Sequence, residues 1–203
     1  MLKTRIAVLV SGGGTNLQAI IDAQKSGIIN NGEVAVVIAS NSEAYALERA
    51  SKAGIPGVVV KRREATQADF EQGIINVLDE YKIDIIVLAG FMCILSESFT
   101  SRYPERIINV HPSLIPSFCG KGFYGLHVHE AALEYGVKVT GATVHFVNEI
   151  PDGGRIIAQK AVPIEDGDTP EVLQRRVMEQ AEWIILPEAV EKVSYDIRKS
   201  KEV

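Results

Sequence analysis

The fold is constrained most by a series of short, wholly apolar runs that alternate with amphipathic segments. No polar residue interrupts these runs, which occupy positions 6–10, 34–39, 58–60 and 85–89. Strands without in/out alternation are typical of a parallel sheet whose two faces are both covered by helices. Between the runs, apolar residues recur at helical spacing, most clearly over 68–81. The sequence therefore predicts a doubly wound α/β fold.

The rest of the chain first extends this pattern and then departs from it. Further helices are expected at 16–26 and 44–53, and a further strand at 107–110. The last third has alternating, β-rich sequences at 137–147 and 155–162. Two longer strands are expected there, antiparallel because a short loop joins them.

A final helix is expected from Thr169 to Val193. Thr169 and Pro170 suit its N-cap and first turn, and Pro187 should kink or interrupt it because proline lacks an N–H. We expect one domain over residues 1–203. Its fold class is α/β, with a Rossmann-like, open, mostly parallel twisted sheet, helices on both faces and antiparallel C-terminal strands.

Composition and charge exclude several classes of protein. Of the 203 residues, 46% are hydrophobic and 23% are charged, as in an ordinary globular protein. The net charge of −5 argues against nucleic acid as a partner, since phosphate backbones bind basic faces. The first apolar run is too short for a signal sequence or a membrane span. Cys93 and Cys119 lack the spacing of metal ligands, so a reduced, cytoplasmic setting is expected.

An amide and an imidazole lie two positions apart in the stretch 108–112. Side chains at this spacing share one face of a strand, and Pro112 ends the strand because it cannot donate to the ladder. Asn109 could then hold an oxyanion through its N–H, while His111 could move a proton near neutral pH. The alternative is a purely structural Asn and His.

A second polar segment strengthens the catalytic interpretation. Asp152 follows Pro151 and precedes two glycines, a composition typical of a turn. It would complete, with Asn109 and His111, the acid, proton carrier and amide needed for acyl-group transfer. The alternative is that Asp152 only starts the turn, as Asp often does.

A glycine-rich segment, 11–17, follows the first strand and opens the first helix. Its glycines let backbone N–H groups approach a phosphate, and a helix N-terminus favours an anion. The segment lacks the third glycine of the dinucleotide fingerprint, the second strand lacks its acidic end, and no Walker lysine follows. A small phosphate ester is the better ligand, and the alternative is a tight turn without a ligand.

The segment 89–95 ends the fourth strand, where open α/β sheets build their binding crevice. Its backbone could bind a flat heterocycle. The alternative is a loop that packs Met92 and Leu95 into the core.

The remaining histidines have no clear chemical pattern. His127 and His129, together with His111 and Cys119, suggest a metal site, but their spacing fits no closed zinc set. A solvated helix start is expected instead. His145 is expected to be a core or supporting residue.

Five motifs together resemble the phosphoribosylglycinamide formyltransferase family, folate-dependent enzymes of purine synthesis. In order, the motifs are 11–20, 88–92, 109–114, 143–147 and 152–154, and they span nearly the whole chain. The resemblance implies the formyltransferase fold. It also implies transfer of a formyl group from 10-formyltetrahydrofolate to the amine of phosphoribosylglycinamide, in de novo purine (IMP) biosynthesis.

The resemblance also implies roles for individual residues. The catalytic trio would be Asn109, His111 and Asp152. Ribonucleotide binding would fall to Gly14, Thr15, Asn16 and Glu182. Folate binding would fall to Met92, Cys93, Ile94, Leu95, Asn109 and Gln67. The partners would be these two small molecules, with folate as cosubstrate and without metal, nucleic acid or membrane.

The chain departs from the family pattern in three places. Cys93 stands where the family often has Arg, so only backbone contacts would remain there. A family Arg near the folate tail falls close to Gln67, and one of the basic residues at 61–63 (Lys61, Arg62 or Arg63) would substitute for it. The loop 117–124 is longer than usual and is expected to cover the folate.

The implied mechanism is attack of the amine on the formyl carbon. Asn109 and protonated His111 would stabilise the oxyanion, and Asp152 would raise the pKa of His111. The nearest alternative is a formyltetrahydrofolate deformylase, which would need an extra N-terminal domain. A transfer-RNA formyltransferase would need an extra C-terminal one. A non-catalytic nucleotide-binding module would not need the trio.

Overall fold

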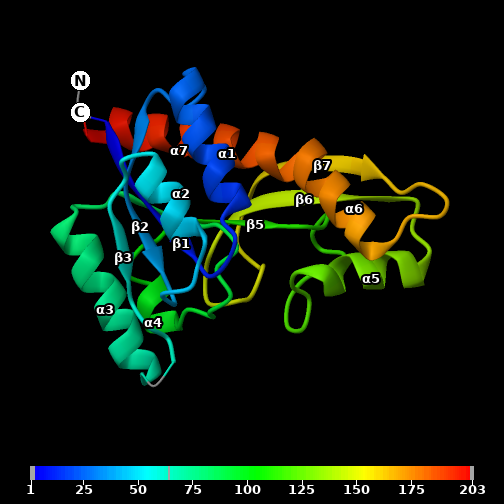
Figure 1. Cartoon of the computed structure of the whole chain (residues 1–203), viewed down its shortest axis with the longest axis horizontal. Coiled ribbons are helices and arrows are strands. Elements are labelled where there is room, and N and C mark those ends of the chain that lie inside the picture. Colours follow the sequence, from blue (N-terminus) through cyan, green and yellow to red (C-terminus); the bar gives the residue numbers. More distant parts are fainter. Residues whose placement is uncertain (1–2, 64, 202–203) are drawn as a thin grey trace.

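The computed structural model describes residues 3–63 and 65–201 and is built around one seven-stranded sheet (Figure 1). The strands are β1 (Thr4–Val10), β2 (Gly32–Ala39), β3 (Gly57–Val59), β4 (Ile85–Leu88), β5 (Ile107–His111), β6 (Val139–Phe146) and β7 (Ile156–Pro163). They lie in the order β3-β2-β1-β4-β5-β6-β7. The first five run parallel, whereas β6 and β7 pair antiparallel. The order of the strands reverses between β1 and β4. Open α/β sheets bind ligands in the crevice that such a reversal leaves at the carboxyl ends of the strands.

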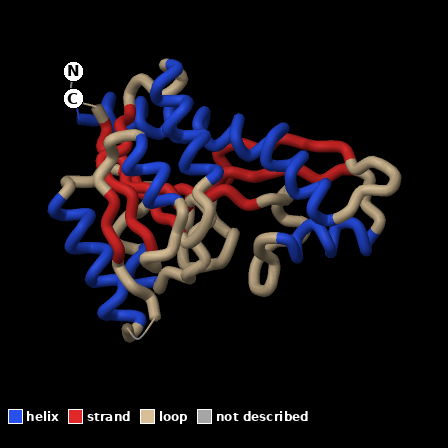
Figure 2. The backbone as a smooth tube through the Cα atoms, in the orientation of Figure 1, coloured by secondary structure: helices blue, strands red, loops and turns tan. Residues whose placement is uncertain are grey.

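Helices cover both faces of the sheet, as the apolar runs predict (Figure 2). They are α1 (Thr15–Ser26), α2 (Ala46–Lys52), α3 (Gln67–Glu80), α4 (Glu97–Thr100), α5 (Leu126–Tyr135), α6 (Pro170–Val177) and α7 (Trp183–Lys201). A π-helical turn, η1 (Met178–Glu182), joins the last two. The sequence does not predict α4, and it predicts only the start of α5.

Alternate residues of β1 show how the two faces are buried. Ile6, Val8 and Val10 belong to a core cluster with residues of α1, α2, α6 and α7. Ala7 and Leu9 belong to a second cluster with residues of α3 and α4. All five side chains are fully buried. Neither face of the strand contacts solvent, which explains why its sequence does not alternate between apolar and polar residues.

Of the two outcomes predicted at Pro187, a kink or an interruption of the last helix, the interruption is wrong. Pro187 lies buried inside α7, which continues to Lys201. The irregular turn comes earlier, at Met178–Glu182. A helix can pass through a proline by giving up one hydrogen bond, and tertiary packing decides whether it does. Here α7 packs against α1, β1 and β2, which outweighs the lost bond.

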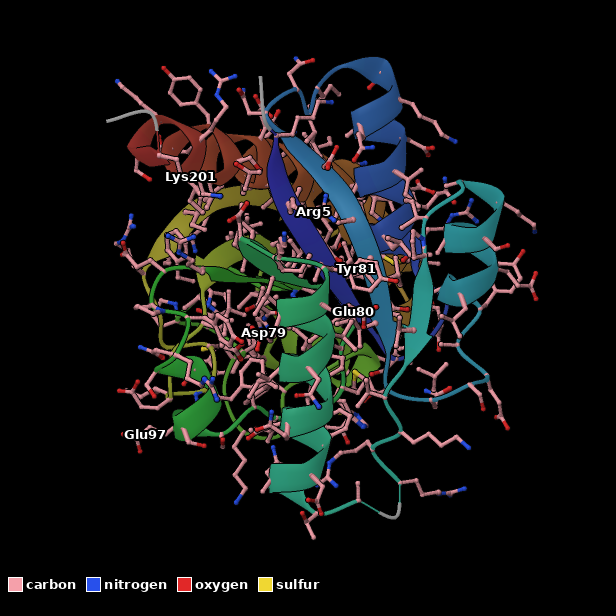
Figure 3. The ribbon with its side chains drawn as sticks, turned by 90° about the vertical axis from the view of Figure 1, so that its left-hand side faces the viewer. Arg5, Asp79, Glu80, Tyr81, Glu97 and Lys201 are labelled. Atoms are coloured by element: carbon pink, nitrogen blue, oxygen red, sulfur yellow. The ribbon has the colours of Figure 1, made fainter. Side chains whose placement is uncertain are left out.

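Two polar contacts tie the amino ends of the central strands to neighbouring helices. Arg5 of β1 donates through Nε to the carbonyl of Tyr81 (2.6 Å), and Figure 3 shows both residues near the C-terminal end of α3. Lys201 pairs with Asp84, 2.5 Å from Nζ to Oδ1. Within the described ranges, no helix has the length and apolar composition needed to cross a bilayer.

Candidate active site

The strand β5 carries Asn109 and His111, and the antiparallel strand β6 lies beside it. Asn109 is opposite His145, and His111 is opposite Thr143. Because side chains alternate along a strand, this register gathers Asn109, His111 and His145 on one face. Both imidazoles are buried, and Asn109 is half-buried.

Asp152 reaches this group from the loop between β6 and β7. Its backbone has φ +57°, an uncommon conformation for a residue with a side chain. Its carboxylate lies between the two imidazoles, with Oδ2 3.6 Å from Nδ1 of His111 and Oδ1 3.5 Å from Nε2 of His145. The structure thus brings the three predicted catalytic residues together and adds a second histidine.

Sequence reasoning gave His145 no chemical role. Its Nε2 lies 3.2 Å from Nδ2 of Asn109, and its Nδ1 lies 2.8 Å from the carbonyl oxygen of Phe146. In the sequence, His145 stands in an alternating strand and in one of the five motifs, 143–147. These features place His145 beside Asn109 only when the β5–β6 register is known.

The charges of Asp152 and His111 depend on competing effects. Burial opposes ionisation of Asp152, but the neighbouring imidazoles of His145 and His111 and the Gly120 N–H together hold its pKa below the usual value. Burial lowers the pKa of His111 and outweighs the opposite effects of the Phe118 carbonyl and Asp152. Asp152 therefore acts on the pKa of His111 in the predicted direction, while the net pKa of His111 is lowered.

The loop 117–124 contacts both members of this pair. The carbonyl oxygen of Phe118 lies 2.8 Å from Nε2 of His111, and the Gly120 N–H donates to Oδ2 of Asp152 (2.8 Å). Phe118 itself has φ +48°. The long loop therefore closes directly over the imidazole and the carboxylate in this structure.

The glycine-rich segment opens α1 as predicted. Gly14 is the N-cap, with φ +72°, and no side chain caps the first turn, so no capping side chain occupies its N–H groups. Asn16 donates through Nδ2 to Oε2 of Glu182, 2.7 Å away. Burial raises the pKa of Glu182 despite this bond. The fold thus joins two of the predicted ribonucleotide residues, while Thr15 beside them is exposed.

The segment 92–95 lies at the end of β4 with Met92 and Ile94 largely exposed and Leu95 buried. The Met92 N–H donates to Oγ of Ser11 (3.0 Å), which joins this segment to the glycine-rich loop. Half of the structural alternative is thus correct, because Leu95 packs into the core and Met92 does not.

Gln67 and the nearby basic residues flank this segment. Gln67 donates to the carbonyl of Ile94 (3.0 Å) and accepts from Arg62 (3.1 Å). Arg62 also lies close enough to Cys93 to lower the pKa of its thiol, although burial raises it more. A cavity of about 790 Å³ adjoins, lined in part by Lys61, Arg62 and Arg63.

The other histidines do not assemble a metal site: in the described part of the chain, no group of His, Cys, Asp and Glu side chains is arranged so that it could hold a metal ion. His127 is exposed and pairs with Glu130 (2.8 Å). His129 is fully buried, and neither ring nitrogen has a hydrogen-bond partner among the described residues. Burial, with the charge of His111, lowers the pKa of His129 to about 4.

This buried imidazole predicts acid sensitivity. The folded pKa of His129 lies below that of the unfolded chain, so protonation of this ring opposes folding. This effect is absent above about pH 6.5 and lowers the free energy of unfolding progressively below it, by up to about 3 kcal/mol. We expect His129→Leu to reduce the loss of unfolding free energy between pH 7.5 and 4.5, measured by urea unfolding. His127→Leu, at an exposed position, should leave that loss unchanged. An equal loss in wild type and His129→Leu would contradict the prediction.

Comparison with known proteins identifies the family. The family model described as "Formyl transferase" matches residues 4–190. A phosphoribosylglycinamide formyltransferase of Haemophilus influenzae is 44% identical over 90% of this chain and 84% of its own length. The trifunctional purine biosynthetic protein adenosine-3 of Homo sapiens is 44% identical over 95% of this chain, which spans 18% of that longer protein.

Solved structures agree with the sequence relatives. The glycinamide ribonucleotide transformylase 1 of Symbiobacterium toebii superposes with a TM-score of 0.89 and 42% identity, covering 96% of this chain and 89% of that one. The phosphoribosylglycinamide formyltransferase of Brucella melitensis superposes with a TM-score of 0.86 and 42% identity, covering 95% of this chain and 96% of that one. The resemblance indicated by the motifs is confirmed, and the chain belongs to the formyl transferase family.

Proposed function

We propose that this protein transfers the formyl group of 10-formyltetrahydrofolate to the amine of phosphoribosylglycinamide. The observation that carries the proposal is the cluster of Asn109, His111 and Asp152 at the carboxyl end of β5. An imidazole beside a carboxylate, with an amide on the same face of the sheet, suits a reaction that develops an oxyanion and moves a proton. The similarity to proteins named phosphoribosylglycinamide formyltransferase supports the choice of substrates.

In the proposed reaction, the substrate amine attacks the formyl carbon and a C–N bond forms. The carbonyl oxygen becomes an oxyanion, which accepts hydrogen bonds from Nδ2 of Asn109 and from protonated His111. The bond from the formyl carbon to the folate nitrogen then breaks. One proton moves from the attacking amine to that nitrogen through His111, so the residues end unchanged.

Asp152 has an electrostatic role in this scheme. Its ionised carboxylate favours the imidazolium form of His111, which the buried surroundings disfavour. His111 must exchange its contact with the Phe118 carbonyl for one with the substrates. The loop 117–124 therefore has to move when they bind.

The two substrates would bind to different segments of the chain. The open N–H groups of α1, with Thr15, would bind the phosphate, and Glu182, held by Asn16, would bind the ribose side. The exposed segment 92–95 and Gln67 would bind the folate. A hydrolase that uses water as acceptor has no need of a phosphate loop, so the transferase is favoured. The cytoplasm is the proposed compartment.

The direct test incubates the purified protein with both substrates and follows formyl transfer by mass. We expect formylated ribonucleotide and unsubstituted tetrahydrofolate in equal amounts. Formate released at the same rate without ribonucleotide would instead indicate the deformylase.

Phosphate binding can be tested at Gly13. A Cβ added there meets no atom within 4 Å, so Gly13→Val should fold normally while obstructing the N–H groups. We expect the Kd for ribonucleotide to rise at least about tenfold, because charge-assisted hydrogen bonds are worth about 1.5–3 kcal/mol. Calorimetry would measure this, with the Kd for a folate analogue as the unchanged control. Unaltered ribonucleotide affinity would show that the glycines form only a turn.

Gly14 is unsuitable for this test. An added Cβ would lie 2.6 Å from Cβ of Ala46, and φ is +72°. A side chain at Gly14 would therefore disturb the packing of α1 on α2 and the fold together with the ligand.

A further inference from the structure

His145 occupies the position between two of the predicted catalytic groups. Its ring is 1% exposed, and its Nε2 lies 3.2 Å from Nδ2 of Asn109 and 3.5 Å from Oδ1 of Asp152. Its Nδ1 lies 2.8 Å from the carbonyl oxygen of Phe146. A buried ring with both nitrogens engaged cannot turn freely, so its hydrogen-bonding pattern is fixed by these partners.

The partner of Nδ1 determines where the proton is. A carbonyl oxygen can only accept, so Nδ1 of His145 must carry the hydrogen in its contact with Phe146. In the neutral ring, Nε2 is then a pure acceptor. An acceptor at 3.2 Å from the amide nitrogen of Asn109 matches the N–H groups that this nitrogen carries.

This arrangement sets the orientation of the Asn109 amide. The Nδ2 group has two hydrogens, and His145 takes only one of them. The other remains available to an oxyanion. If the amide were turned by 180°, its oxygen would take the place of Nδ2, and a carbonyl oxygen there would face the lone pair of Nε2.

The same tautomer affects Asp152. An Nε2 without a hydrogen cannot donate to the carboxylate, although it lies beside it. The groups facing Asp152 are then the Gly120 N–H, which already donates, and Nδ1 of His111 at 3.6 Å. The carboxylate is therefore left to stabilise a proton on His111, whose charge also interacts with His129.

We propose that His145 is a positioning residue: as a neutral ring protonated on Nδ1, it turns one N–H of Asn109 toward the oxyanion and reserves Asp152 for His111. The catalytic part of this inference rests on the proposed formyl transfer. The tautomer itself does not, and it can be tested without any substrate.

Two substitutions separate positioning from simple packing. In His145→Gln the amide lies near the place of Nε2, and its oxygen can accept from Asn109. In His145→Asn the amide lies near the place of Nδ1, so it can keep the bond to the Phe146 carbonyl but loses the contacts with Asn109 and Asp152. Val144→Ala, at a buried neighbour on β6, controls for loss of volume.

We expect His145→Asn to lower kcat by about 10²-fold, the usual cost of one oxyanion donor. His145→Gln should recover most of that loss. In both variants, KM for the ribonucleotide should stay within about threefold of wild type, because the residues proposed to bind the ribonucleotide are not in contact with His145. Equal kcat in the two variants, or a loss confined to KM, would overturn the inference. Thermal unfolding of each variant shows whether it is folded.

A measurement on the wild-type protein covers the case in which a variant does not fold. Nitrogen-15 NMR of the histidine rings at neutral pH should show His145 protonated on Nδ1 and unprotonated on Nε2. A proton on Nε2 would overturn the inference even if the wild-type protein transfers formyl groups. Absence of transfer by the wild-type protein would instead contradict the proposed function.

Discussion

Replacing His111 by Ala should lower kcat for formyl transfer by at least about 10²-fold, because it removes both a proton carrier and an oxyanion donor. These interactions exist mainly in the transition state, so the Kd for ribonucleotide should stay within about threefold of wild type. Steady-state kinetics and calorimetry on the same preparation would measure the two quantities. Turnover within a few-fold of wild type would remove His111 from the mechanism.

The matched control for that experiment is His111→Gln. Its amide can still donate to the Phe118 carbonyl, so it preserves the contact that holds the loop 117–124. It cannot take up a proton near neutral pH. Both variants should therefore lose turnover, and only the Ala variant should also lose the loop contact, which proteolysis at the loop would report.

Asp152→Asn should produce the second large effect, a sharp fall in activity at neutral pH. Burial already lowers the pKa of His111, and the charge of Asp152 opposes that. A neutral amide no longer favours the imidazolium, so the pKa of His111 should fall further and the alkaline limb of the pH–rate profile should shift to lower pH. NMR titration of His111 would measure the pKa shift directly.

Glu149→Gln is the control, because it neutralises an exposed carboxylate of the same loop. It should leave the His111 titration and the pH–rate profile where they are in wild type. An unchanged His111 pKa in Asp152→Asn would contradict the electrostatic role of that carboxylate.

The sheet was predictable because its central strands are buried on both faces. Ile6 to Val10 and Ile85 to Leu88 have no polar positions, and only a sheet covered by helices buries such strands completely. The antiparallel end was equally visible in its alternating sequence. The π-helical turn at Met178–Glu182 was not, since it depends on how α6 and α7 pack against the sheet.

From the sequence, only the part of the candidate site whose residues lie close together along the chain was predictable. Asn109 and His111 are two residues apart on one strand, and their shared face follows from that spacing. The approach of His111 to Asp152 depends on the β5–β6 register and on a turn with φ +57°, neither of which spacing reveals. The place of His145 and the closure of the loop 117–124 depend on the same register.

The proposed catalytic cluster comes from one stretch of chain, 107–152, which folds as β5, α5, β6 and the following turn. The predicted phosphate site comes from elsewhere, from the loop after β1 and from Glu182 in the π-helical turn. Under the proposed function, the reaction chemistry and the choice of acceptor are therefore encoded by separate segments. In evolution, a lineage could then exchange one acceptor amine for another through substitutions at the β1 loop and the π-helical turn, while the residues of 107–152 stay unchanged.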